Sequence, residues 1–458
     1  MLPDGFYLRM KTLLGDEIDD FVSSLSEPAV RGIRLNSIKN ASKEELIEDG
    51  FSLTEIPYWK GAFISDGDDK IGKSPAHHSG QIYVQDPGAM SALSALEIKE
   101  GWRVLDLCSA PGGKSGQAAE RIGESGFLLS NEFVPKRAKI CVGNFERLGY
   151  KNAMVTSLDT KEFKKYFNAH FDLVIVDAPC SGEGMFRKNE NATLEWSEEN
   201  VAISAERQRE ILDNAAPLVK PCGYLVYSTC TFSLEENEMQ VDAFLERHSD
   251  FTIEKCQSAL IEASSDGINF EGASNANLHY ARRFYPHKSR GEGQFVALLK
   301  KKEGESAGKT VLYKDASCEA SREEMNLVKK FFSENLSSIP AGNVRKIGEN
   351  LVLISHGCPV LPKSVFSAGV LIGEVRRGVL HPAHQFFSCY GTLFKRKLSL
   401  TKDDERLKKY LMGEEIPAPE IDSNGYVAVL YKSTALGGGK FSSGVIKNHY
   451  PKGLRNVN

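Results

Sequence analysis

The sequence lacks several features that would place its 458 residues in a specialised class of protein. No two of its nine cysteines are spaced as C-x-x-C, so we expect neither a structural zinc site nor another bound metal. No apolar run approaches the roughly 18 residues that a membrane-spanning helix needs. The net charge of −4 excludes a polycation, so nucleic acid would have to be bound through local basic patches.

The composition is that of an ordinary globular protein, with 41% apolar and 26% charged residues and no repeats. The length favours about three domains. The first ten residues carry an acid and no apolar stretch follows them, so we expect no signal peptide. Scattered unpaired cysteines fit a reducing compartment, which favours a cytoplasmic protein without membrane association.

The first 80 residues are predicted to form a small α+β domain. Acidic residues dominate here, since residues 1–90 hold 15 Asp/Glu against 9 Lys/Arg. The segments 31–36 and 52–59 have the character of strands, and KEELIEDG (43–50) has that of a short helix.

Residues 81–302 are predicted to form an α/β domain in which strands and helices alternate. Expected strands are 102–107, 127–132, 153–159, 171–179, 221–230 and 294–301, and expected helices are 115–122, 135–149, 199–220 and 234–248. The segment 171–179 is apolar throughout, as in a strand buried on both faces. This alternation is typical of a doubly wound, mostly parallel sheet.

The remaining chain is predicted to hold a linker and two further domains. KKKEGESAGK (300–309) is charged and contains glycine and serine, as linkers do. We expect an α+β domain over 310–390, with a helix at 321–334 and strands near 350–355 and 369–376. The last domain, 391–458, holds 12 Lys/Arg against 7 Asp/Glu.

The turn after the first strand of the α/β domain has the position of a cofactor site, because doubly wound sheets bind ligands at the carboxyl ends of their strands. A P-loop needs a glycine where Cys108 stands, and G-x-G-x-x-G is absent, which disfavours NAD and FAD. S-adenosylmethionine needs no phosphate cradle and is the expected cofactor, with a plain turn as the alternative. The expected contacts are Cys108, Ser109, Ala110, Pro111, Gly112, Gly113 and Lys114.

Acids follow the next three strands of this domain. Glu132 stands 19 residues after Gly113, where a carboxylate can bind ribose hydroxyls. Asp159 ends the third strand and could accept from an adenine amino group, and Asp177 ends the fourth. One such acid could be a helix cap, but three in register favour a binding site.

Two cysteines, Cys180 and Cys230, lie just beyond the fourth and fifth strands and should face the same crevice. Both stand in turns rich in glycine, serine or threonine, which is a poor fit to buried, inert cysteines. The inert role is expected instead for the remaining cysteines outside the cofactor turn, Cys141, Cys222, Cys256, Cys318, Cys358 and Cys389.

Four motifs in this order resemble those of the NOL1/NOP2/Sun family of RNA cytosine-5 methyltransferases: DLCSAPGGK, DAPCSGEGMFRK, YSTCTFSLEENE and RRFYPHKSRGEGQFVALL. GMFRK (184–188) and the tail at 437–455 are most similar to the bacterial YebU/RsmF type, which modifies small-subunit ribosomal RNA. The resemblance implies a Rossmann-like class I methyltransferase core with a small domain before it and two domains after it, the last PUA-like.

Cytosine C5 becomes nucleophilic when a cysteine thiolate attacks C6. Asp177 is placed to relieve the charge that develops around N3, and a second, weakly basic side chain must then remove the C5 proton. The chemistry alone does not decide between the two cysteines. The resemblance implies that Cys230 is the nucleophile and that Cys180 assists release.

The RNA base must be unpaired or flipped out, and basic residues near the crevice are candidates for holding its flanks. The expected RNA contacts are Arg187, Lys188, Arg282, Arg283 and Lys288, with Lys447, Lys452 and Arg455 in the tail. Solvated basic loops are the alternative. A transfer RNA methyltransferase, a non-catalytic ribosome assembly factor and a nucleotide-dependent oxidoreductase are the other functions considered, and a monomer suffices for all of them.

Overall fold

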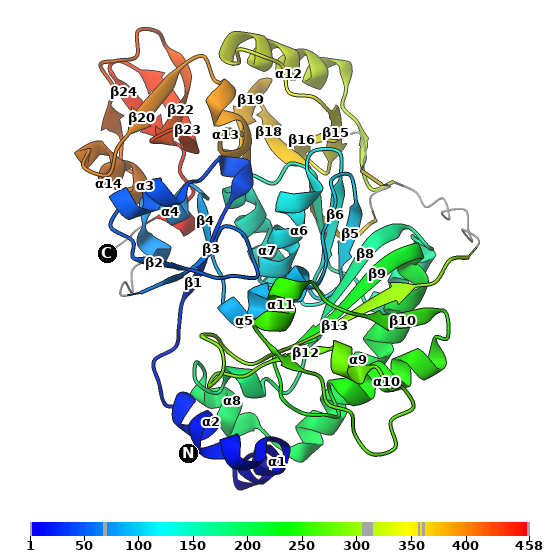
Figure 1. The fold of residues 1–458 in the computed structure, drawn as a ribbon. Coiled ribbons are helices and arrows are strands. Elements are labelled where there is room, and N and C mark those ends of the chain that lie inside the picture. The colour runs from blue at the N-terminus through cyan, green and yellow to red at the C-terminus, as the bar shows by residue number, and fades with distance from the viewer. Residues whose placement is uncertain (1, 67–70, 305–314, 356–357, 360–361, 456–458) are drawn as a thin grey trace.

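The structure is a computed structural model, and it describes residues 2–66, 71–304, 315–355, 358–359 and 362–455 (Figure 1). Its central layer is a large mixed sheet with the strand order β11-β12-β13-β9-β8-β5-β6-β7-β17, and β10 also pairs with β13. Within the described part of the chain, no helix combines the length and the apolar character needed to cross a membrane.

The predicted parallel core is confirmed, because β9, β8, β5, β6 and β7 run parallel and β13 is antiparallel to β9. The strands of this sheet are β5 (Arg103–Asp106), β6 (Phe127–Asn131), β7 (Ala153–Thr156), β8 (Phe171–Asp177), β9 (Val219–Thr229), β10 (Phe251–Glu254), β11 (Ser265–Asp266), β12 (Arg282–Phe284) and β13 (Gln294–Lys301). The third predicted strand thus ends at Thr156, before its acid.

Both faces of the sheet are buried, which explains why its strands are apolar throughout. Alternate residues enter two clusters: Leu105 and Val174 lie in one, and Val104 and Ile175 in the other. The helices of the domain are α5 (Pro87–Met90), α6 (Gly113–Ile122), α7 (Pro135–Leu148), α8 (Glu190–Glu195), α9 (Glu198–Ala215), α10 (Glu238–Arg247) and α11 (Ser258–Glu262). Residues of α6 and α7 cover one face, and residues of α9 and α10 cover the other.

The N-terminal region has two parts. A four-stranded sheet in the order β2-β3-β1-β4 contains β1 (Gly32–Leu35), β2 (Leu53–Glu55), β3 (Ala62–Ser65) and β4 (Ile82–Val84), with α3 (Lys43–Glu48) and α4 (Pro75–His78) beside it. Two helices that the sequence analysis missed, α1 (Asp4–Leu14) and α2 (Ile18–Ser24), lie apart from this sheet (Figure 1). Their Phe6 and Phe21 pack instead with Phe186 and Phe232, which follow the two cysteines.

The C-terminal region contains two five-stranded sheets. The first holds β14 (Cys318–Glu319), β15 (Asn343–Ile347), β16 (Asn350–Ile354), β18 (Val370–Arg376) and β19 (Val379–Pro382), with α12 (Arg322–Asn335) and α13 (His384–Tyr390). The second holds β20 (Lys397–Leu400), β21 (Ile416–Pro417), β22 (Gly425–Tyr431), β23 (Thr434–Ser442) and β24 (Val445–Asn448), with α14 (Glu405–Met412). Of the predicted linker, Lys300 and Lys301 belong to β13, and residues 305–309 lie outside the described residues.

Segments that are far apart in the sequence lie side by side in the structure. β17 (Val365–Ala368) extends the central sheet by pairing antiparallel with β7, a connection that the sequence pattern does not show. Lys39 of the N-terminal region donates to the Ser388 hydroxyl at 3.2 Å, and Tyr431 of the last sheet donates to Asp49 at 2.8 Å. The N-terminal domain therefore contacts the last sheet through the segments around α3 (Figure 1).

Candidate active site

A cavity of about 670 Å³ lies at the carboxyl ends of the parallel strands. It has the size of a site for a small molecule or cofactor. The predicted residues that line it come from five different strand ends and are Cys108, Ala110, Glu132, Asp159, Asp177, Cys180 and Cys230. The strand order β9-β8-β5-β6-β7 brings these residues together, although more than 120 positions separate the first from the last.

The rest of the predicted cofactor turn, Ser109, Pro111, Gly112, Gly113 and Lys114, does not line the cavity. Gly112 precedes α6 with a φ of 107°, a conformation that favours glycine. A side chain at Gly113 would come within 3.2 Å of the Tyr83 ring. At this second glycine α6 therefore packs closely against the N-terminal region, where a larger residue would push on Tyr83 and Gln85.

Asp177 at the end of β8 is held by two partners. The Lys114 ammonium lies 2.8 Å from Asp177 Oδ2, and the Ser228 hydroxyl donates to Oδ1 at 2.9 Å. The Lys114 side chain is 8% exposed and that of Asp177 is 33% exposed, so the lysine is shielded from solvent while the carboxylate faces the cavity. Beneath it, burial raises the pKa of Asp106 to about 7, and Ser115 donates to that carboxyl at 2.6 Å.

Glu132 and Asp159 occupy the far end of the cavity and differ in burial. The Glu132 side chain is 5% exposed, accepts from the Val134 amide at 3.0 Å and lies 3.4 Å from Arg137. Asp159 is 36% exposed, and its hydrogen bond with Lys161 lowers its pKa. Both carboxylates can accept from hydroxyl or amino groups of a ligand in the cavity.

The sulfur atoms of Cys180 and Cys230 are 3.3 Å apart on the wall of the cavity. They follow neighbouring parallel strands, so the pair results directly from the sheet order. The hydrogen bond to Cys230, together with burial, raises the pKa of the Cys180 thiol well above its usual value. The Cys180 thiol is therefore held in contact with the Cys230 sulfur.

Three predicted RNA contacts are corrected because their side chains are buried in ion pairs. The Arg187 side chain is 3% exposed and donates to Glu292 at 3.0 Å. Arg283 pairs with Glu238, and these two side chains are 2% and 0% exposed. Arg282 is 4% exposed and pairs with Asp266. Arg282 and Arg283 lie in β12, an inner strand of the sheet, and not on a solvent-facing loop.

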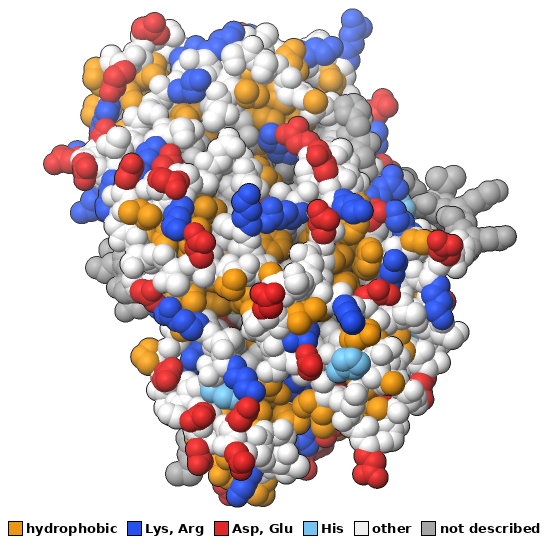
Figure 2. Space-filling model, viewed as in Figure 1, with side chains coloured by type: hydrophobic (Ala, Val, Ile, Leu, Met, Phe, Trp, Pro, Cys, Tyr) orange, Lys and Arg blue, Asp and Glu red, His pale blue; other side chains and the backbone are white. Residues whose placement is uncertain are grey.

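The other predicted RNA contacts remain at least partly accessible. Lys188 is 24% exposed and pairs with Asp86 at 2.7 Å, and Lys288 is 42% exposed and pairs with Glu17 at 2.7 Å. In the tail, Lys447 and Lys452 are exposed, whereas Arg455 donates to the Tyr450 carbonyl at 3.2 Å. On the face shown in Figure 2, cationic and anionic side chains are interspersed.

Some residues of the cavity were missed in the sequence analysis. Phe133 and Arg137 follow β6, and Arg207 and Glu210 project from α9. Phe133 is 66% exposed, which is unusual for a phenylalanine and marks a surface that can receive a flat ligand. Its position directly after Glu132 was the signal available in the sequence.

Comparisons with known proteins agree with this geometry. Residues 93–300 match the family described as 16S rRNA methyltransferase RsmB/F, residues 2–87 match the N-terminal domain of 16S rRNA methyltransferase RsmF, and residues 397–456 match the methyltransferase RsmF PUA domain. The chain is 31% identical to Ribosomal RNA small subunit methyltransferase F of Vibrio vulnificus strain YJ016, over 99% of this chain and 97% of that protein.

Solved structures show the same core. A methyltransferase homolog protein from Pyrococcus horikoshii has a TM-score of 0.58 at 25% identity, covering 65% of this chain and 94% of its own. NSun6 from Pyrococcus horikoshii with SFG has a TM-score of 0.56 at 22% identity, covering 66% and 99%, which shows the shared fold. These findings confirm the resemblance, the Rossmann-like fold, the PUA-like end and the expected cofactor class. The chain belongs to the RsmF family of S-adenosylmethionine-dependent 16S ribosomal RNA methyltransferases.

Proposed function

We propose that this chain methylates C5 of cytosine in small-subunit ribosomal RNA through a covalent bond between Cys230 and C6. The observation that carries the proposal is the pair of sulfur atoms 3.3 Å apart, on the wall of the cavity that Asp177 also lines. A methyltransferase acting on an exposed nitrogen or oxygen has no need for two adjacent cysteines, whereas cytosine C5 needs a nucleophile and a base.

Cys230 would attack first. Its thiolate forms a bond to C6, and the electrons of the C5=C6 bond give C5 the character of an enamine carbon. S-adenosylmethionine supplies the methyl group, which C5 takes as the bond to the sulfonium sulfur breaks. Asp177 would hold a proton at N3, where negative charge develops, and would take it back as the bond from C6 to Cys230 breaks. The Lys114 ammonium 2.8 Å away keeps this carboxyl group in place.

Cys180 would act in the release step. In the free enzyme the Cys180 thiol shares a hydrogen bond with the Cys230 sulfur, which keeps the two groups in contact. Once that sulfur is a thioether it no longer carries charge, so the Cys180 thiol can ionise to water. Its thiolate then takes the C5 proton, the C5=C6 bond re-forms, and the bond from C6 to Cys230 breaks.

The cofactor fits the other end of the cavity. Glu132 would bind the ribose hydroxyls, Asp159 the adenine amino group and Phe133 the adenine face, while Cys108 and Ala110 line the site between them and the cysteines. Each of these residues is supplied by this one chain, which supports a monomer as the active unit. We propose that the domains at 1–80, 310–390 and 391–458 bind RNA around the catalytic domain at 81–302. The accessible cations for this binding are Lys188, Lys288, Lys447 and Lys452.

The test compares two cysteine variants on unmodified small-subunit ribosomal RNA with S-adenosylmethionine. Cys230→Ala should form no covalent RNA–protein complex and no 5-methylcytosine, because the attacking sulfur is gone. Cys180→Ala should accumulate a complex that survives denaturing electrophoresis, because attack and methyl transfer remain possible. The double variant should form none.

Three results would contradict the proposal. A trapped complex with Cys230→Ala and none with Cys180→Ala would assign the nucleophile to Cys180. Methylation of transfer RNA but not of small-subunit ribosomal RNA would mean that transfer RNA is the substrate. RNA binding without any methyl transfer by the unaltered chain would indicate a non-catalytic assembly factor.

A further inference from the structure

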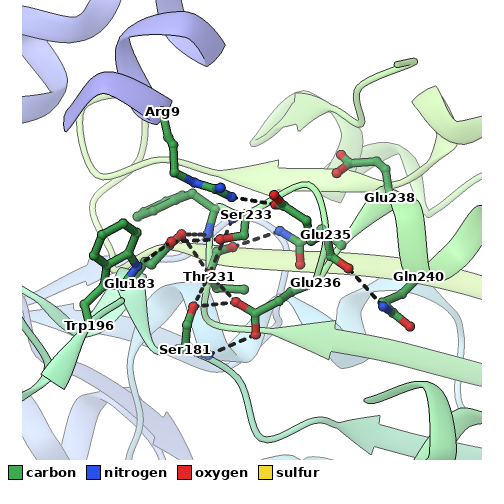
Figure 3. A network of polar contacts seen from close by, with 12 residues as sticks. Arg9, Ser181, Glu183, Trp196, Thr231, Ser233, Glu235, Glu236, Glu238 and Gln240 are labelled. Atoms are coloured by element: carbon green, nitrogen blue, oxygen red, sulfur yellow. Dashed lines mark hydrogen bonds and ion pairs between the residues drawn. The ribbon is translucent and has the colours of Figure 1, made fainter. Parts of the chain in front are cut away.

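Two buried glutamates connect the loops that carry the cysteines, in a crossed arrangement (Figure 3). Glu236 follows Cys230 in the chain but accepts hydrogen bonds from Ser181, the residue after Cys180. Glu183 follows Cys180 but accepts from the backbone of Phe232, beyond Cys230, at 2.9 Å. Each loop thus depends on a carboxylate from the other loop.

Glu236 is surrounded by donors. Its Oε2 accepts from the Ser181 amide at 2.9 Å and from Gln208 Nε2 at 2.8 Å, and its Oε1 accepts from the Ser181 hydroxyl. The residue is fully buried, and burial raises its pKa to about 7. The Ser181 amide belongs to the peptide that leaves Cys180, so its bond to Glu236 fixes where the Cys180 sulfur points.

The loop that carries Cys230 depends little on Glu236 for its position. The Thr231 hydroxyl reaches Glu236 at 3.3 Å but Glu183 at 2.8 Å. The Thr231 carbonyl accepts from Asn237, and the Cys230 carbonyl accepts from the Gly184 amide at 2.9 Å. Loss of the Glu236 side chain would therefore remove the acceptor of the Ser181 amide, next to Cys180, and leave Ser181 only its contact with the Thr231 hydroxyl at 2.9 Å. The loop that carries Cys230 would keep its own hydrogen bonds.

We propose that Glu236 is a positioning residue that holds Cys180 against Cys230 and so determines the rate of the release step. The inference rests on the covalent mechanism proposed above. Without Glu236, Cys230 still attacks and methyl transfer still occurs, but the base is displaced from the C5 proton. The variant should then behave like Cys180→Ala although both cysteines are present.

The experiment uses the full chain, S-adenosylmethionine and unmodified small-subunit ribosomal RNA. Glu236→Ala should turn over roughly 100-fold more slowly, since a positioned proton acceptor contributes about 10²–10⁴-fold, and the covalent complex should accumulate. Glu236→Gln should restore turnover: its amide oxygen can accept from the Ser181 amide and Gln208, and its NH₂ can donate to the Ser181 and Thr231 hydroxyls. If Glu236→Ala does not fold, Glu236→Asp, which withdraws the carboxylate from Ser181, takes its place.

Glu235→Ala is the matched control, because this neighbouring carboxylate pairs with Arg9 and is 39% exposed. It should not accumulate the complex. Cys180→Ala separates the two claims: if it traps no complex, the proposed mechanism fails, and if it traps one while Glu236→Ala does not, only the positioning role fails. A Glu236→Gln variant that traps as much complex as Glu236→Ala would overturn positioning through hydrogen bonds.

Discussion

The carboxyl edge of the central sheet and the basic segments beside it differ in how well the sequence predicts the environment of their side chains. At the edge, Glu132, Asp159, Asp177, Cys180 and Cys230 line one cavity, as their positions after successive strands predict. Among the basic residues, Arg187, Arg282 and Arg283 are buried in ion pairs that their positions do not predict.

The difference comes from what determines each environment. Parallel strands end at one edge of the sheet, so residues that follow them share a crevice whatever their side chains. An arginine that faces the interior instead requires a particular carboxylate. Arg283 finds Glu238 from α10, 45 positions earlier in the chain, and such a partner cannot be recognised from local composition.

The largest effect on stability is expected at Arg283. Arg283→Met leaves the fully buried Glu238 carboxylate without its cation, which should lower the free energy of unfolding by about 3–5 kcal/mol. Urea unfolding followed by circular dichroism measures the loss. RNA affinity of the folded fraction should not change, because this arginine does not face solvent.

Arg290→Met is the matched control for this prediction. Arg290 lies in the same motif, RRFYPHKSRGEGQFVALL, and pairs with Asp66, but both side chains are about half exposed, at 55% and 45%. Exposed pairs contribute about 0–1 kcal/mol. Equal losses for the two variants would mean that burial is not what distinguishes the arginines.

A smaller effect, on cofactor binding, is expected at the carboxyl edge. Glu132→Ala should weaken S-adenosylmethionine binding by about 1.5–3 kcal/mol, the range for a hydrogen bond to a charged group. Asp159→Ala should lie at the lower end of that range, since Asp159 is 36% exposed and shared with Lys161. Titration calorimetry measures both, and unchanged affinity in either variant would remove that residue from the site.

Much of the fold could be predicted because strand and helix periodicities persist through residues 102–301. The helices α1 and α2 were missed, since they are stabilised by Phe186 and Phe232, far away in sequence, rather than by a sheet of their own. The pairing of β17 with β7 was missed for the same reason. At the site, the motifs predicted both cysteines, but the roles of Glu183 and Glu236 depend on contacts between two loops.

The smallest effect is expected in the tail. Lys447 and Lys452 are exposed, whereas Arg455 packs on the Tyr450 carbonyl. Changing both lysines to glutamine should raise the apparent Kd for small-subunit ribosomal RNA and lower the slope of log Kd against log salt by about 1.4, because each cation neutralising a phosphate of single-stranded RNA contributes about 0.7. Arg455→Gln should change the slope less, although it removes a full charge, because its guanidinium is already bound within the protein. An Arg455→Gln slope change equal to half of that in the double lysine variant would mean that the tail contributes only general charge. An unchanged slope in the double lysine variant would mean that Lys447 and Lys452 do not touch RNA.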